Sequence, residues 1–241
     1  MKETKNRNPL KLLCVADEKD PLVYSPNIKE RYNDVDAVIG AGDLPMEYYG
    51  FIVSMLNKPL FFVFGNHQLK HFKRFKKPDH MTFEFHDQMH ASNKKKSYEL
   101  DYFGSTYIGG KVKYVKELDV IIAGMGGSYR YNNGENQFSE VQMYMKLLKL
   151  FPKLLYNRMV RGRWVDIFVT HAPPFGIHDQ EDRCHRGFSA FLWFMRVFSP
   201  KYLLHGHIHL LDINEKRADT YRNTQVINVF QQYILEVERN G

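Results

Sequence analysis

The sequence has few cysteines, no long apolar run and no repeated segment. Cys14 and Cys184 are the only cysteines among 241 residues, so a disulfide framework is not expected. Cys14 lies inside an apolar segment and is expected to be a small buried residue. No segment approaches the roughly 18 uninterrupted apolar residues of a membrane span. Low-complexity and linker compositions are also absent, which predicts a single domain over residues 1–241.

The N-terminal segment does not have the pattern of a secretory leader. Its short apolar run leads into acidic residues instead of a small-residue cleavage site, so it is interpreted as a first strand and a cytoplasmic location is predicted. The net charge is +7 and the isoelectric point is about 9.2. Such a basic surface can attract nucleic acid, anionic lipid or a phosphorylated small molecule, or it can serve solubility alone.

Short apolar runs alternate with helical patterns, which indicates βαβ units of an α/β fold. The runs are nearly continuous in apolar character, as expected for strands buried on both faces. Strands are predicted at Lys11–Ala16, Asp36–Ile39, Leu60–Phe64, Val120–Ala123, Asp166–Thr170 and Lys201–Leu204, with two more within Thr220–Val237.

Three helices are predicted between these strands. They cover Met46–Leu56, a segment that starts at Ser139, and Ser189–Phe198. Ser139 and Gln142 have the spacing of a capping box, and Val141, Met145 and Leu148 then recur at the spacing of one helix face. Residues 68–107 have no clear period and are predicted to form an excursion or cap outside the sheet.

Polar groups follow the predicted strands one after another. Such strand ends meet at one edge of an open α/β sheet, where ligands bind. Carboxylate, amide and imidazole groups together suit divalent manganese, iron, zinc or nickel, so we expect a metal site there. The competing interpretation is that these are ordinary turn residues. It accounts for Gly42-Asp43 alone, but it does not account for the four histidines His67, His171, His207 and His209 as well. The groups concerned are Asp17, Asp43, Asn66, His67, His171, His207 and His209.

These motifs resemble the signature of the calcineurin-like metallophosphoesterases. The matching elements are Gly42-Asp43, Gly65-Asn66-His67, Thr170-His171 and Gly206-His207-Ile208-His209, and their order is kept along nearly the whole chain. The resemblance implies a four-layer α/β/β/α sandwich with two mixed sheets flanked by helices. It also implies hydrolysis of a small phosphorylated substrate, a phosphodiester or a phosphomonoester, by in-line attack of water that two divalent cations activate.

The resemblance also implies a role for each residue. Asp43 would bridge the two cations, with Asn66, His171 and His207 at the second site and Asp17 and His209 at the first. His67 would be the catalytic residue, either as a general acid for the leaving oxygen or as a donor to the phosphoryl group.

The first motif departs from the family pattern, because Asp17-Glu18-Lys19 replaces Asp-x-His. An ammonium group is a poor metal ligand, so the first site is expected to be weakened but still occupied. Two alternatives stay open for Lys19: its charge replaces that of the first cation near the substrate, or its side chain turns to solvent. Lys19 also favours an alternative function, that of a metal-binding scaffold with little activity. The presence of His67 argues against this alternative, because a scaffold does not need that residue. A nuclease is a further alternative, which the positive charge permits.

Two loops offer further substrate-binding candidates. Arg130 follows a glycine-rich turn, and with Tyr131 nearby it can hold a substrate phosphate or base; the alternative is an exposed turn. His185 lies before the Ser189 helix, where a solvated loop is the competing interpretation. His205 precedes the last motif and is expected to support it. His86 and His90 lack the intervening glutamate of a zinc helix and are expected to be surface residues.

Overall fold

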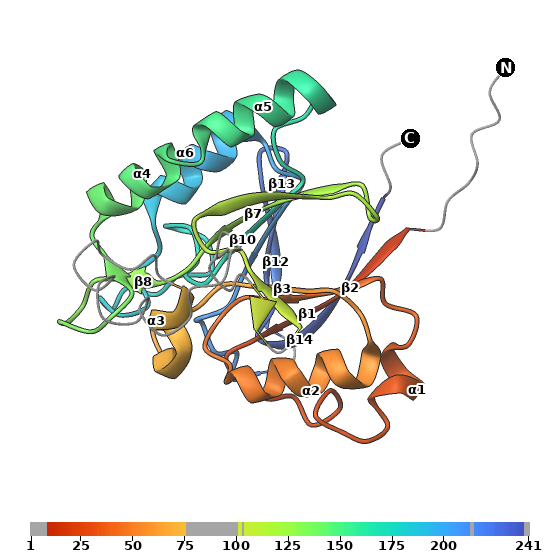
Figure 1. The fold of residues 1–241 in the computed structure, drawn as a ribbon. Helices are drawn as coiled ribbons and strands as arrows, with labels where there is room; N and C mark the ends of the chain where they lie inside the picture. The colour runs from red at the N-terminus through yellow and green to blue at the C-terminus, as the bar shows by residue number, and fades with distance from the viewer. Residues whose placement is uncertain (1–8, 76–100, 103, 213–214, 239–241) are drawn as a thin grey trace, which may run out of the picture.

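The computed structural model describes residues 9–75, 101–102, 104–212 and 215–238, and these ranges form two mixed sheets with helices on their outer faces (Figure 1). The first sheet has the strand order β14-β1-β2-β3-β5-β4, and only β14 and β4, at its edges, run antiparallel to their neighbours. Its strands are β14 (Gln231–Val237), β1 (Leu10–Ala16), β2 (Ala37–Gly40), β3 (Leu60–Phe62), β5 (Ser105–Tyr107) and β4 (Asp101–Tyr102).

The second sheet repeats this plan, with four parallel strands inside and an antiparallel strand at each edge. Its strands, in order, are β12 (Ala218–Tyr221), β13 (Thr224–Asn228), β11 (Tyr202–His205), β10 (Ile167–Thr170), β7 (Val120–Met125) and β6 (Lys111–Val115). A separate pair joins β8 (Ser128–Tyr129) to β9 (Gln137–Phe138).

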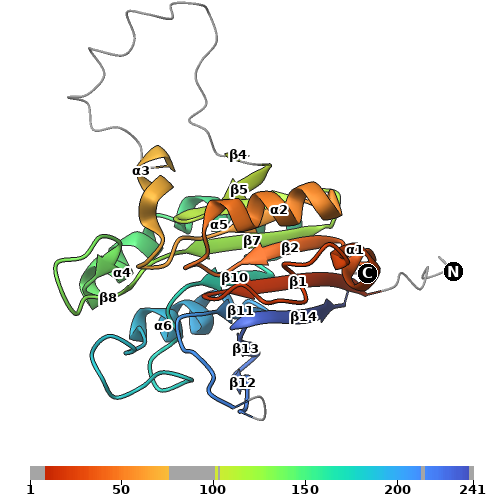
Figure 2. The ribbon, with the colours of Figure 1, turned by 90° about the horizontal axis from the view of Figure 1, so that it is seen from below.

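The helices form the two outer layers. The first sheet is covered by α1 (Ile28–Tyr32) and α2 (Met46–Leu56), and the second by α4 (Glu140–Leu148), α5 (Phe151–Arg161) and α6 (Ser189–Phe198) (Figures 1 and 2). A short 3₁₀ turn (Leu69–His71) and α3 (Phe72–Phe75) follow β3. No helix within the described ranges is long and apolar enough to cross a membrane.

The alternation of side chains along β1 explains the four layers. Leu12 and Cys14 point between the sheets, where they pack with residues of the second sheet such as Ile167. Leu13 and Val15 point the other way, into the apolar cluster under α2. Both faces of the strand are therefore buried, and the continuous apolar run of the sequence follows from this position.

The predicted α/β sandwich is confirmed, and most predicted elements lie within one or two residues of the observed ones. The capping box at Ser139 is present, since Ser139 Oγ accepts from the Gln142 amide and the Gln142 side chain accepts from the Ser139 amide. Two details were wrong. The C-terminal segment forms three strands, β12 to β14, instead of two. Asp101–Tyr102 and Ser105–Tyr107 belong to the first sheet as β4 and β5, inside the region predicted to leave it.

Candidate metal centre

Loops from both sheets place the predicted polar residues at one edge of the sandwich. Asp17 directly follows β1, Asp43 follows β2, and Asn66 follows β3. From the second sheet, His171 directly follows β10 and His207 comes two residues after β11. We call these five residues the central cluster. They approach one another although they are separated by up to 190 positions in the sequence.

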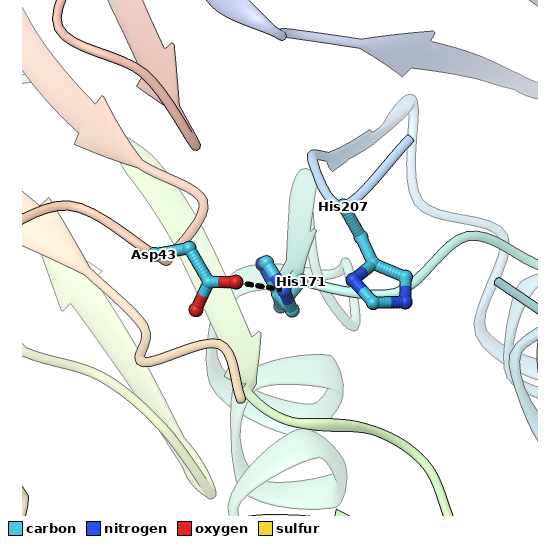
Figure 3. Close-up of side chains that lie close together, drawn as sticks. All are labelled: Asp43, His171 and His207. Carbon is cyan, nitrogen blue, oxygen red and sulfur yellow. Dashed lines mark ion pairs between the residues drawn. The ribbon is translucent and has the colours of Figure 1, made fainter. Parts of the chain in front are cut away.

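Asp43 and His171 form one of the contacts that join the two sheets in the central cluster. The Oδ2 atom of Asp43 lies 3.1 Å from Nε2 of His171 (Figure 3). Oδ1 of the same carboxylate accepts a hydrogen bond of 2.7 Å from the His67 amide. Burial raises the pKa of Asp43, but the charge of His171 and these hydrogen bonds outweigh burial and lower it below its usual range. Asp43 is therefore ionised and available to a cation at neutral pH.

The two central histidines are oriented by backbone carbonyls, which can only accept hydrogen bonds. Nδ1 of His171 donates to the Ala41 carbonyl at 2.9 Å, which leaves Nε2 directed at Asp43 and at Oδ1 of Asn66, 3.1 Å away. Nε2 of His207 donates to the Cys184 carbonyl at 2.7 Å and leaves Nδ1 available to a ligand. This is how metal-binding histidines are usually held, with one ring nitrogen bonded to an outer acceptor.

Asp17 lies at the base of the central cluster. Its two carboxylate oxygens accept from the His207 amide at 2.8 and 3.0 Å, and Oδ1 lies 3.9 Å from Nδ1 of His171. Burial raises the pKa of Asp17 to about 7, and the nearby charge of Asp43 adds to the effect while His171 opposes it. A buried carboxyl group of this kind is poised to take a cation in place of a proton.

The donor set fits a divalent cation. Asp43, His171 and His207 each offer a ligand atom, and these atoms lie within 4.8 Å of one another. The amide oxygen of Asn66 lies 3.1 Å from Nε2 of His171 and adds a second oxygen donor next to this group. Such a set is typical of manganese, iron, zinc and nickel sites.

Two glycines make the close approach of these groups possible. A Cβ atom on Gly65 would lie 2.1 Å from Oδ1 of Asp43 and 2.5 Å from Nε2 of His171. A Cβ atom on Gly206 would lie 2.5 Å from Oδ2 of Asp17. Glycine at these two positions is therefore required by space.

The remaining predicted site residues lie around the central cluster or away from it. His67 contacts the cluster through its amide, and its side chain is exposed. His209 is half exposed, with its Nδ1 atom 3.7 Å from Oε1 of Glu18. The His185 ring lies 5.4 Å from the His207 ring, between centroids, and its Nδ1 atom is 2.8 Å from Oδ2 of Asp182.

Lys19 and Arg130 have partners outside the central cluster. The Lys19 ammonium lies over the Tyr24 ring, 4.8 Å from its centroid. Arg130 donates to Oε1 of Gln142 at 3.0 Å, beside the N-terminus of α4. His86 and His90 lie outside the described residues.

The structure adds supporting residues that the motifs did not reveal. The Tyr131 hydroxyl accepts from Nδ2 of Asn66 at 3.2 Å, which turns the amide oxygen of Asn66 toward His171. Asn136 donates to the Gly65 carbonyl at 2.6 Å and so holds the loop that carries Asn66. The sequence indicates only a substrate contact for Tyr131. No local sequence pattern shows that its hydroxyl reaches Asn66, 65 positions away.

His205 supports the last motif, as expected. It is fully buried, and its Nε2 atom lies 2.9 Å from Nδ1 of His178. Nε2 of His178 in turn lies 3.1 Å from Oδ2 of Asp219. Burial lowers the pKa of His205 to about 3, so this ring is neutral and acts as part of the packing beneath His207.

Comparisons with known proteins agree with this architecture. Residues 18–211 match the calcineurin-like phosphoesterase family, and the chain therefore belongs to this family of metal-dependent phosphoesterases. One solved structure aligns at a TM-score of 0.60 and 14% identity, over 95% of both chains. The protein TT1561 of Thermus thermophilus aligns at a TM-score of 0.52 and 11% identity, over 95% of this chain and all of its own. At these identities the structures show the common fold. No curated protein matches the chain.

Proposed function

We propose that this protein hydrolyses a phosphodiester or phosphomonoester by in-line attack of water at a metal centre formed by the central cluster. The observation that carries the proposal is the orientation of His171 and His207. Each donates one ring nitrogen to a carbonyl and leaves the other beside Asp43. A divalent cation bound there supplies a Lewis acid that polarises the phosphoryl group and lowers the pKa of water.

The residues of the chain have separate roles in this proposal. The carboxylate of Asp43 and the imidazoles of His171 and His207 hold the cation, and Asn66 contributes its amide oxygen. His67 lies at the exposed side of Asp43, where its imidazole can donate a proton to the leaving oxygen. Such general acid help contributes typically about 10²–10⁴-fold to the rate.

A second cation is proposed on the other side of Asp43, with Asp17 and His209 as ligands. The side chain of Asp17, a member of the central cluster, is buried, whereas that of His209 is half exposed, so this site would be the more open of the two. The contact that Lys19 forms, with the ring of Tyr24, involves none of the proposed ligands. The Lys19→Ala variant should therefore keep the wild-type rate within about twofold.

The proposal is tested by hydrolysis of bis-p-nitrophenyl phosphate beside p-nitrophenyl phosphate. The protein is first stripped with a chelator and then assayed with and without manganese. Activity should return only with the metal and should be lost in Asp43→Asn. A matched control is Asp34→Asn, because Asp34 forms an ion pair with Lys11 at the surface. The ratio of diester to monoester rates then defines the substrate class.

The scaffold alternative predicts a different result in the same assay. A scaffold would bind manganese without turnover, and His67→Ala would change nothing measurable. In the proposed enzyme, His67→Ala should bind manganese normally while the rate falls by about 10² or more. Metal binding without hydrolysis of either ester, with manganese, iron, nickel or zinc, would refute the enzymatic proposal. A nuclease would instead cleave DNA and bind it with a steep dependence on salt.

A further inference from the structure

The neighbouring helices α4 and α5 both carry several exposed apolar side chains. Met159 is 77% exposed, Val141 71% and Val160 58%. Figure 1 shows both helices in the layer that covers the second sheet, on the side opposite α1 and α2. We call this surface the α4–α5 face; it consists of Val141, Met145, Leu148, Phe151, Leu155, Tyr156, Met159 and Val160.

The helical spacing shows that this face is directed away from the core. In α5 only Leu154 and Asn157 are buried, and they lie on the inner side. Phe151, Leu155 and Met159 recur every four residues and form an adjoining outer row. An ordinary surface helix has its apolar residues inside and its polar residues outside, whereas most apolar residues of α5 are exposed.

The apolar face of α4 that the sequence pattern indicated is also the exposed one. Val141, Met145 and Leu148 face solvent, whereas Met143 and Leu147 pack on the core. Exposed apolar surface shared by neighbouring helices marks a site of contact with a protein or a membrane.

The charged side chains of α4 and α5 are mainly basic, since their one acidic residue, Glu140, accepts a hydrogen bond from the Ala190 amide near the start of α6. No aspartate or glutamate occurs from residue 141 to residue 165, and the stretch contains six basic residues. Arg163 forms ion pairs with Asp119 and Asp166. For Lys149, Lys153 and Arg158 the described part of the chain provides no carboxylate partner. The six residues are Lys146, Lys149, Lys153, Arg158, Arg161 and Arg163.

We propose that the α4–α5 face docks the protein onto the surface of a bilayer that contains anionic lipid. A helix with an apolar face bordered by Lys and Arg lies in the plane of the membrane interface, with its apolar side chains among the acyl chains. Lys153 and Arg158 sit on opposite borders of the α5 apolar rows, where they can reach phosphate headgroups. A twofold contact with a second copy would instead oppose cations to cations. The proposal is independent of the proposed phosphoesterase activity.

The test is co-sedimentation of the full-length protein with vesicles. We expect binding to vesicles of phosphatidylcholine mixed with phosphatidylglycerol, weaker binding as salt rises, and little binding to phosphatidylcholine alone. The double variant M159E/V160E should reduce partitioning at least roughly tenfold, because two apolar side chains no longer enter the interface. Both residues are exposed, so the fold is retained. The triple variant K149E/K153E/R158E should reduce partitioning onto the vesicles on the order of 100-fold at low salt. This estimate takes roughly fivefold for each cation that is lost.

A matched control uses the same kind of substitution on the other side of the molecule. Leu22 is 45% exposed and lies near Tyr24, which packs on α2, so Leu22→Glu should bind vesicles like the wild type. The proposal is overturned if the wild type does not bind anionic vesicles at low salt, or if M159E/V160E binds them equally well. It is also overturned if M159E/V160E dissociates a dimer seen by light scattering while the wild type shows no vesicle binding.

Discussion

Replacing Gly65 by alanine tests whether the central cluster depends on the close approach of its loops. The added Cβ atom would lie 2.1 Å from Oδ1 of Asp43 and 2.5 Å from Nε2 of His171. Gly65 does not have a positive φ angle, so alanine introduces no backbone strain there. The methyl group therefore acts only by displacing the carboxylate and the imidazole.

The expected effect on metal binding is larger than the effect on folding. Overpacking a buried position costs typically about 1–3 kcal/mol of unfolding free energy. Displacing the Asp43 carboxylate changes a proposed ligand itself, so manganese affinity should fall by at least the ~10–100-fold seen when ligand-supporting groups are lost. Hydrolysis of the nitrophenyl esters should fall in parallel.

The assay combines manganese titration of the chelated protein with urea unfolding. Gly162→Ala is the control, because Gly162 has a φ of 73° with no heavy atom within 4 Å of the position of its Cβ atom. That variant should lose about 1–2 kcal/mol of stability through backbone strain and bind manganese normally. The two variants thus separate loss of stability from loss of the site.

One result would refute this reasoning. If Gly65→Ala folded and bound manganese with wild-type affinity, the carboxylate of Asp43 and the imidazole of His171 would not have to approach as closely as the structure shows. The central cluster would then not be the metal centre, and the assignment of Asp43 and His171 as ligands would fail with it.

Further predictions concern the support of the cluster and its response to acid. Tyr131→Phe removes the hydrogen bond that orients Asn66, so manganese affinity should fall roughly 10-fold in a titration, while urea unfolding changes by no more than ~1.5 kcal/mol. Unchanged affinity would contradict this. Burial lowers the pKa of His205 and of His207 to about 3, so both contribute stability that is present above pH 6.5 and lost as the pH falls. Two groups oppose this loss over the same range: the pKa of Asp17 is raised to about 7, and the pKa of His171, despite its burial, is raised to about 9 by Asp43. The chelated protein should therefore lose about 1–2 kcal/mol between roughly pH 6.5 and pH 5, measured by urea unfolding, and a flat profile would contradict the burial of these rings.

The parts of the fold that sequence analysis predicted well are those with a dominant local signal. The interior strands are buried on both faces and are therefore continuous apolar runs, and α2 and α6 were placed to the residue. In contrast, α5 was not predicted, because its core-facing side has only Leu154 and Asn157 and its apolar residues lie outside. The pattern of an amphipathic helix is present in α4, but the pattern alone does not show whether the apolar side faces the protein core or the solvent.

The central cluster was predictable for a similar reason, since each of its residues comes shortly after a strand. What the sequence could not provide is the orientation of side chains, which depends on partners far away in the chain. The Cys184 carbonyl that holds His207 and the Tyr131 hydroxyl that holds Asn66 have no local signature. The partner of Lys19, the ring of Tyr24, likewise required the structure.

The pairing of β1 with β14 has a consequence for the order in which the molecule can be assembled. Leu10 lies opposite Val237, so the edge of β1 is covered only by a strand that is synthesised much later. During synthesis the N-terminal part emerges long before this partner exists. The first sheet is therefore completed only after β14 has been synthesised, and until then the edge of β1 is open to wrong pairing. A cation that joins Asp43 to His171 would lock the two sheets together at the end of this process.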